Sequence, residues 1–185
     1  MSRNVYHLIA LVSAICILWS DTSVSALEPK PGEPVNGLQA ELLLDHVVFK
    51  VGEPIPVSIE LRNVGDQPLA VFKGLIPVYN SYGEALFVLE TLDGRSISIT
   101  HPEDDRPAPL TEDFARLQPG QVVKVQTELR PTDWTWGMEP GRYALRVQVN
   151  VHANAAYDGT HMRPVEQVWT DSVVSNAVTI EVDNP

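Results

Sequence analysis

Apolar residues recur at nearly every second position over much of the chain beyond residue 37, the pattern expected of half-buried β-strands. The clearest examples are residues 55–62, 123–130 and 143–151. Five further stretches show the pattern less regularly or over a shorter length, namely residues 69–72, 85–92, 95–100, 165–169 and 177–182. Residues 38–51 also alternate, but the apolar parity changes near Asp45 and His46, which predicts a bulge or bend there.

Turn-forming residues separate these stretches. Asp93-Gly94 stands between two β-prone runs and predicts a hairpin, because Asp and Gly adopt the positive φ angles of tight turns. Pro119-Gly120 and Pro140-Gly141 precede two of the clearest strands. Residues 101–116 are predicted to form a long surface loop with the option of one helical turn over residues 111–116, and residues 153–164 a polar loop.

Eight or nine short strands without an amphipathic helix or an internal repeat predict an all-β fold. The architecture we expect is an immunoglobulin-like antiparallel β-sandwich of about eight strands, formed by residues 38–185. Tyr143 should be buried beside Gly141, because it starts the cleanest apolar stripe in the chain. Trp169 is expected to pack within a strand.

The first 26 residues have the features of a removable export signal. Arg3 is basic, residues 8–19 are apolar apart from one serine, and Val24-Ser25-Ala26 offers small residues for cleavage. A membrane anchor is the alternative, but a spanning helix needs roughly 20 apolar residues. Residues 27–37 follow as an extended leader rich in Pro and Gly. We therefore expect a secreted or periplasmic protein without membrane insertion after cleavage.

The amino-acid composition limits the kinds of site and partner that the mature chain can have. The single cysteine, Cys16, lies within the signal, so the mature chain has no disulfide, thiolate metal site or cysteine nucleophile. The chain has 24 acidic and 13 basic residues and a net charge of −11. Nucleic-acid binding needs a basic surface and is excluded on this ground, whereas cationic or neutral partners are favoured.

Several turn and strand-entry motifs occur in a fixed order along the chain: Val51-Gly52-Glu53-Pro54, Leu61-Arg62-Asn63-Val64-Gly65-Asp66, Leu117-Gln118-Pro119-Gly120, Pro140-Gly141-Arg142-Tyr143 and Ser175-Asn176-Ala177-Val178. With these motifs the chain resembles bacterial exported immunoglobulin-like domains. It is similar in particular to the proteinase-inhibitor-type sandwich and to the N-terminal sandwich of deuterolysin-type peptidases. The zinc-peptidase motif His-Glu-x-x-His does not occur, so this resemblance implies the sandwich alone.

No catalytic or metal-binding pattern stands out. The histidines beyond the signal, His46, His101, His152 and His161, have none of the close spacings that favour a metal pair. The acidic run Glu103-Asp104-Asp105 lacks the alternating spacing of a calcium loop. The chain contains no nucleophile elbow or phosphate-binding loop. We therefore predict a protein that is not an enzyme and that needs no metal or other cofactor.

The most suggestive segment for binding is the loop with Trp134, Trp136 and Met138. Exposed Trp and Met side chains anchor protein interfaces, and paired tryptophans also stack on sugars. The alternative is that these residues cap one end of the core. The leading hypothesis is a non-catalytic binding module with a protein or glycan partner. An inhibitor of an extracytoplasmic protease, implied by the resemblance, and a metal carrier or enzyme with scattered loop residues are the alternatives.

Overall fold

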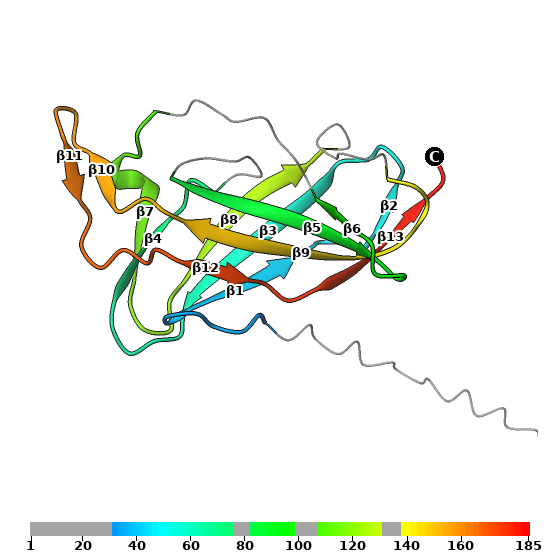
Figure 1. Ribbon diagram of the computed structural model, residues 1–185, viewed down its shortest axis with the longest axis horizontal. Coiled ribbons are helices and arrows are strands. Elements are labelled where there is room, and N and C mark those ends of the chain that lie inside the picture. Colours follow the sequence, from blue (N-terminus) through cyan, green and yellow to red (C-terminus); the bar gives the residue numbers. More distant parts are fainter. Residues whose placement is uncertain (1–30, 76–81, 99–106, 131–137) are drawn as a thin grey trace, which may run out of the picture.

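The structure, a computed structural model, describes residues 31–75, 82–98, 107–130 and 138–185. The described chain is almost entirely β and contains one short 3-10 helix, η1 (Thr111–Asp113). One sheet has three antiparallel strands in the order β1 (Leu38–Leu43), β3 (Ile55–Asn63) and β8 (Val122–Leu129). The other has the order β2 (Val48–Lys50), β13 (Val178–Asp183), β9 (Gly141–Val151), β5 (Gly83–Thr91) and β6 (Ser96–Ser98), and β12 (Ser172–Val174) also pairs with β9 (Figure 1).

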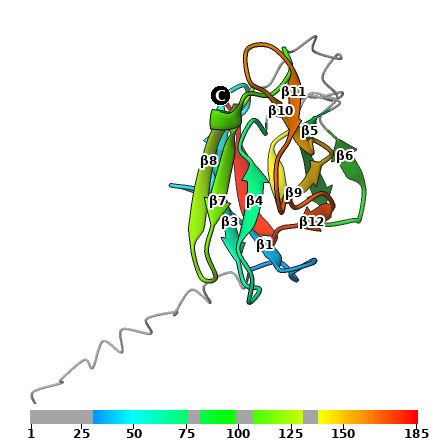
Figure 2. The same ribbon diagram turned by 90° about the vertical axis from the view of Figure 1, so that its left-hand side faces the viewer.

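Two short ribbons complete the fold. Strand β4 (Leu69–Phe72) pairs with β7 (Phe114–Leu117), and β10 (Ala155–Tyr157) pairs with β11 (Met162–Pro164). Figure 2 shows both ribbons at the same end of the molecule. No helix in the described stretches is long and apolar enough to cross a membrane.

The pairing order confirms an all-β sandwich. The first and second long strands, β1 and β3, share a sheet with the late strand β8, while β5, β9 and β13 form the other sheet, as in an immunoglobulin-type fold. Two details differ from the expectation. The described chain has thirteen strands rather than about eight, because several are three- or four-residue pieces. The pairing of β2 with β13 is parallel.

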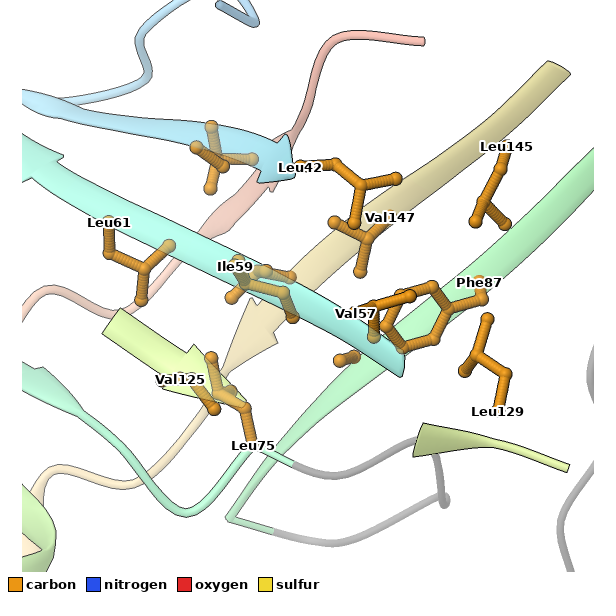
Figure 3. Close-up of a cluster of buried hydrophobic side chains, with 14 of the residues drawn as sticks. Leu42, Val57, Ile59, Leu61, Leu75, Phe87, Val125, Leu129, Leu145 and Val147 are labelled. Carbon is orange, nitrogen blue, oxygen red and sulfur yellow. The ribbon is translucent and has the colours of Figure 1, made fainter. Parts of the chain in front are cut away.

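The core lies between the two sheets. Alternate residues of β3 and β9 point inward, so Ile59 and Val147 from opposite sheets are both completely buried (Figure 3). Phe87 of β5 and Leu129 of β8 belong to the same cluster. The alternating pattern of the sequence therefore produces the inner faces of the sandwich directly.

Tyr143 is buried beside Gly141, as predicted. Its hydroxyl donates a hydrogen bond of 2.7 Å to the carbonyl oxygen of Glu139, four residues earlier. This is the tyrosine corner that immunoglobulin-type sandwiches have at the start of the same strand. The predicted hairpin at Asp93-Gly94 is also present: β5 and β6 pair antiparallel, and Gly94 has φ +82°.

Other local predictions need correction. The bulge or bend predicted near Asp45 is a bend and not a bulge within one strand, because the chain leaves one sheet after β1 and enters the other at β2. The helical turn expected after residue 110 is present as η1, but the residues after it form strand β7. The loop predicted at residues 153–164 is a hairpin, β10–β11.

Trp169 is buried, as expected, but residues 165–169 do not form a strand. Gln167 has φ +58°, so a turn interrupts the segment. In place of the predicted strand, this segment has one parallel bridge, between Ala70 and Val168. The Trp169 indole N–H donates a 2.9 Å hydrogen bond to the carbonyl oxygen of Val35, which ties the residues before β1 to this segment.

Residues 31–37, the described part of the predicted leader, form a turn before β1. Asn36 and Gly37 both have positive φ, and Val35 and Leu38 exchange backbone hydrogen bonds of 2.8 and 2.9 Å across them. These are the features of a tight two-residue turn, for which Asn-Gly is the preferred sequence. Val35 packs against the core, and the Gly32 N–H donates a 3.1 Å hydrogen bond to the carbonyl oxygen of Ala40 in β1, so this turn lies against the sandwich.

Candidate functional site

Strands β5 and β9 run the length of the sandwich and define its two ends. Thr91 pairs with Tyr143 at one end, and Gly83 pairs with Val151 at the other. We call the first the corner end, because it holds Tyr143 and the β5–β6 turn. We call the second the ribbon end, because β10 and β11 project there (Figure 1). Each end has an open cavity.

The corner-end cavity has a volume of about 650 Å³. Its described lining combines apolar and polar side chains: Thr91, Arg95, Ser96, Ile97, Met138, Glu139 and Tyr143. Met138, one of the three residues predicted to bind, is only 6% exposed and belongs to the core cluster as well as to this lining. Trp134 and Trp136 lie outside the described residues.

Local hydrogen bonds order this end. The Arg95 guanidinium lies 3.1 Å from the Asp93 carboxylate, and the Thr91 hydroxyl also donates to Asp93. The Thr91 hydrogen bond, together with Arg95, holds the pKa of Asp93 below its usual value. Burial raises the pKa of Tyr143, and the nearby Glu139 carboxylate adds to this. Tyr143 is therefore a neutral hydrogen-bond donor at physiological pH.

Leu92 is a further candidate that the sequence analysis did not single out. It is 82% exposed at the β5–β6 turn and follows Thr91, which lines the cavity. A signal for it was present: Leu92 stands next to the Asp93-Gly94 turn, on the outward parity of the preceding strand. An apolar residue at such a place has no structural task in the core.

The ribbon-end groove has a volume of about 630 Å³. Its described lining is mainly apolar and aromatic: Phe72, Gly74, Tyr82, Pro107, Ala108, Pro109, Leu110, Asp113 and Tyr157. Leu110 and Tyr157 are 40% and 38% exposed. A parallel bridge joins these two residues, and the Tyr157 N–H donates a 2.6 Å hydrogen bond to the carbonyl oxygen of Pro109.

Asp158 orders the tip of the β10–β11 hairpin. Its carboxylate accepts hydrogen bonds from the Arg163 guanidinium at 2.9 Å and from the backbone N–H groups of Thr160 and His161. These donors, Arg163 first, hold the pKa of Asp158 well below its usual range. The projecting ribbon is thus a locally ordered element.

The outer face of the larger sheet carries a polar row. The Asn150 side chain donates a 2.9 Å hydrogen bond to Glu84, which is only 5% exposed, and the Gln148 amide bonds to both Asn150 and Ser172. One carboxylate oxygen of Glu84 is buried without a hydrogen-bond partner. Glu84 is not among the described residues that line the corner-end cavity or the ribbon-end groove.

The structure does not gather residues for metal binding in the part of the chain it describes. No group of three or more His, Cys, Asp or Glu side chains is close enough there to hold an ion. His46 instead lies against Phe49, with ring centroids 4.4 Å apart, and His152 and His161 are exposed. His101 lies outside the described residues.

No family model matches the chain, and no curated protein matches it in sequence. Among solved structures, the chain is similar to the C-terminal domain of Wzt, with a TM-score of 0.40 and 11% identity over 86% of this chain and 80% of that one. It is similar to AvmM, which catalyses macrocyclization in alchivemycin A biosynthesis, with a TM-score of 0.39 and 11% identity over 85% and 97%. A β-glucosidase from Listeria innocua matches with a TM-score of 0.34 and 15% identity over 78% of this chain but 16% of the enzyme. These values express a weak likeness between β-rich folds.

Proposed function

We propose that the protein is an exported, non-catalytic binding module that contacts a protein partner through the corner end of the sandwich. The observation that carries the proposal is the position of Leu92, a large apolar side chain 82% exposed on the β5–β6 turn. Isolated apolar side chains on a surface are common, but this one directly follows Thr91, which lines the corner-end cavity. Exposed apolar anchors beside a cavity are what protein interfaces use.

The surroundings of Leu92 support a rigid binding surface. Its turn is closed by the backbone hydrogen bond from Thr91 to the carbonyl oxygen of Arg95, at 2.9 Å. The cavity floor contains Met138 and Tyr143, which are anchored in the core. Trp134 and Trp136 precede Met138 by four and two residues in the sequence and are proposed as further anchors. Pre-organised side chains lose little entropy on binding.

Charge defines the class of partner more closely. The chain has a net charge of −11, so an acidic partner would be repelled over most approaches. At the corner end Arg95 and Glu139 both line the cavity, so polar contacts of either sign are available at short range. A neutral or basic protein with an apolar pocket for Leu92 fits these features.

The test compares matched variants in a pull-down from the envelope fraction of the native host, followed by titration of the purified partner. Leu92→Ser, and separately the pair Trp134→Ala and Trp136→Ala, should each weaken binding by about 2 kcal/mol or more, or roughly thirtyfold, if they remove anchors. Val64→Ser replaces an exposed apolar residue that lines neither the corner-end cavity nor the ribbon-end groove, so it is the matched control for Leu92→Ser and should bind as the wild type does.

Melting temperatures separate binding from folding in the same variants. Leu92→Ser should melt like the wild type, because the side chain is already in solvent. Binding that survives both the Leu92→Ser and the double tryptophan substitution would contradict the proposed site. A captured partner whose binding is abolished by glycosidase treatment would contradict the proposed protein partner in favour of a glycan.

A further inference from the structure

The ribbon end has an apolar groove that the proposed function does not use. It is built from four separate parts of the chain: Phe72 ends β4, Tyr82 precedes β5, Pro107 to Leu110 lead into η1, and Tyr157 ends β10. Its volume of about 630 Å³ is within the range of specific ligand sites. Exposed apolar surface of this kind marks a site of interaction more often than a random patch does.

The groove wall formed by Pro107 to Leu110 and Tyr157 offers few backbone N–H groups to which a partner strand could pair. Pro107 and Pro109 have no N–H group. The N–H of Leu110 donates to the Asp113 carboxylate at 2.7 Å, and that of Tyr157 donates to Pro109. Recognition at this wall therefore depends on side chains that enter the groove and on their burial.

The polar content of the lining is also informative. Asp113 is the only charged residue among the described lining residues, and the exposed Glu112 stands next to it. Lys73 is exposed between Phe72 and Gly74 but does not line the groove. The Tyr157 hydroxyl already donates to the carbonyl oxygen of Gly159 at 2.9 Å. A sugar would find few partners for its hydroxyl groups here, whereas a cation beside an apolar group would meet both a carboxylate and aromatic rings.

We propose that this groove binds a short apolar segment of a protein partner in which a Lys or Arg flanks an apolar or aromatic anchor. The anchor is buried among Phe72, Leu110 and Tyr157. The flanking cation lies toward the Asp113 carboxylate, and the net charge of −11 favours its approach at longer range. The groove is thus a second binding site, separate from the corner end.

The probe is a dye-labelled five-residue peptide with a tryptophan between two leucines and a lysine at each end. Two matched peptides replace the terminal lysines with glutamates or with glutamines. Binding to the full chain is followed by fluorescence anisotropy at low and high salt. The lysine peptide should bind at least tenfold more tightly than the glutamate peptide, with the glutamine peptide between them. High salt should narrow this gap, because it screens the charges.

Variants assign the binding to the groove. Leu110→Lys should weaken the lysine peptide at least tenfold, and Asp113→Asn should remove most of the preference for lysine over glutamate. The Asn side chain can still accept the hydrogen bond from the Leu110 N–H, so η1 is kept. Tyr157→Ser serves as the second groove variant if Leu110→Lys does not fold. Val174→Ser changes an exposed apolar residue that lines neither the groove nor the corner-end cavity, and it should bind like the wild type.

Three results would overturn the proposal. One is equal affinity for the lysine and glutamate peptides. Another is unchanged binding of the lysine peptide to a folded Leu110→Lys or Tyr157→Ser chain. The third is displacement of the peptide by a neutral oligosaccharide, which would make the groove a glycan site. Because the probes and variants differ from those of the corner end, either site can fail while the other stands.

Discussion

The two ends of the sandwich are built by different kinds of contact. At the corner end the ordering interactions are local in sequence: Tyr143 bonds to Glu139, and Thr91, Asp93 and Arg95 close a single turn. At the ribbon end the contacts join distant segments, as when Ala70 bonds to Gln167 and Pro109 to Tyr157. The short-range hydrogen bonds leave the corner end rigid around a cavity that is lined by both polar and apolar side chains. At the ribbon end, the packing of distant segments produces a mainly apolar groove.

The two ends of this one scaffold have surfaces of different chemistry. The corner end presents an exposed leucine beside polar and charged groups. The ribbon end presents a concave apolar surface with one lining carboxylate. The two surfaces lie at opposite ends of β5 and β9, so two partners could occupy them without contact. Substitutions of comparable residues at the two ends test this distinction.

The largest expected difference is between two tyrosines. Tyr143→Ala removes a buried ring from the corner and should lower the free energy of unfolding by about 3 kcal/mol or more. Tyr157→Ala removes a ring that is already well exposed and should cost about 1 kcal/mol or less. Urea unfolding of both variants measures the contrast. Equal losses would mean that the ribbon-end tyrosine is as much a part of the core as the corner tyrosine.

A second contrast concerns two glycines. At Gly83, on the ribbon side, an added Cβ would lie 2.8 Å from the Phe72 ring and 3.2 Å from the Asn150 carbonyl oxygen. Gly83→Ala should therefore cost about 1–3 kcal/mol through crowding. At Gly94 nothing lies within 4 Å of an added Cβ, but φ is +82°, so Gly94→Ala should cost about 1–2 kcal/mol through the backbone alone.

A double-mutant cycle distinguishes the two causes. Phe72→Leu shortens the side chain that crowds Gly83 and should recover part of the cost of Gly83→Ala. The same Phe72→Leu change should be additive with Gly94→Ala, because the two residues lie at opposite ends. Additivity in both pairs would contradict the crowding of Gly83 by Phe72.

The hydrogen bond of the tyrosine corner should contribute less than its ring. Tyr143→Phe keeps the ring and loses the bond to Glu139, so the free energy of unfolding should fall by about 0.5–1.5 kcal/mol at pH 7. The pKa of Tyr143 is raised in the folded state, so unfolding favours its deprotonation and stability is lost as the pH rises past about 10. Tyr143→Phe should reduce this alkaline loss, as followed by unfolding at pH 9 and 11.

The smallest expected effect is confined to the β10–β11 tip. Asp158→Asn removes the charge that Arg163, Thr160 and His161 stabilise, so amide hydrogens at residues 160 and 161 should exchange faster while the global unfolding midpoint stays unchanged. In the wild type the pKa of Asp158 is lowered, so its stabilisation of the tip is present above the unfolded value of 3.8 and is lost as the pH falls below it. A shift of the global midpoint would show that the ribbon is coupled to the sandwich core.

Much of the sandwich could be predicted from the sequence because its long strands carry a pattern of period two. Residues 55–62, 123–130 and 143–151 became β3, β8 and β9, with the apolar parity inward. Tyr143 and the Asp93-Gly94 hairpin were also predicted correctly, since each depends on residues within a few positions of one another. Periodicity and turn chemistry depend on residues that are close in sequence, so they can be predicted from the sequence alone.

The errors fall where long-range pairing decides the structure. Residues 165–169 have the composition of a strand, but the turn at Gln167 and the single bridge to Ala70 replace it. The strands β7, β10 and β11 are too short to show a period, and β7 is a strand through its pairing with the distant β4. The sequence could not indicate that Leu110 and Tyr157 lie together, since 46 residues separate them.

The amino-acid sequence is sufficient to predict the all-β class, the inward faces of the longest strands and the acidic character of the protein. The tertiary structure decided that the chain changes sheets after Leu43, that Met138 lies in the floor of a cavity and that Leu92 remains exposed. It also decided the ribbon-end groove. The physical reason is that burial is a property of the assembled sheets: a residue's parity gives the face to which it points, and only the packing of distant segments determines whether that face is covered.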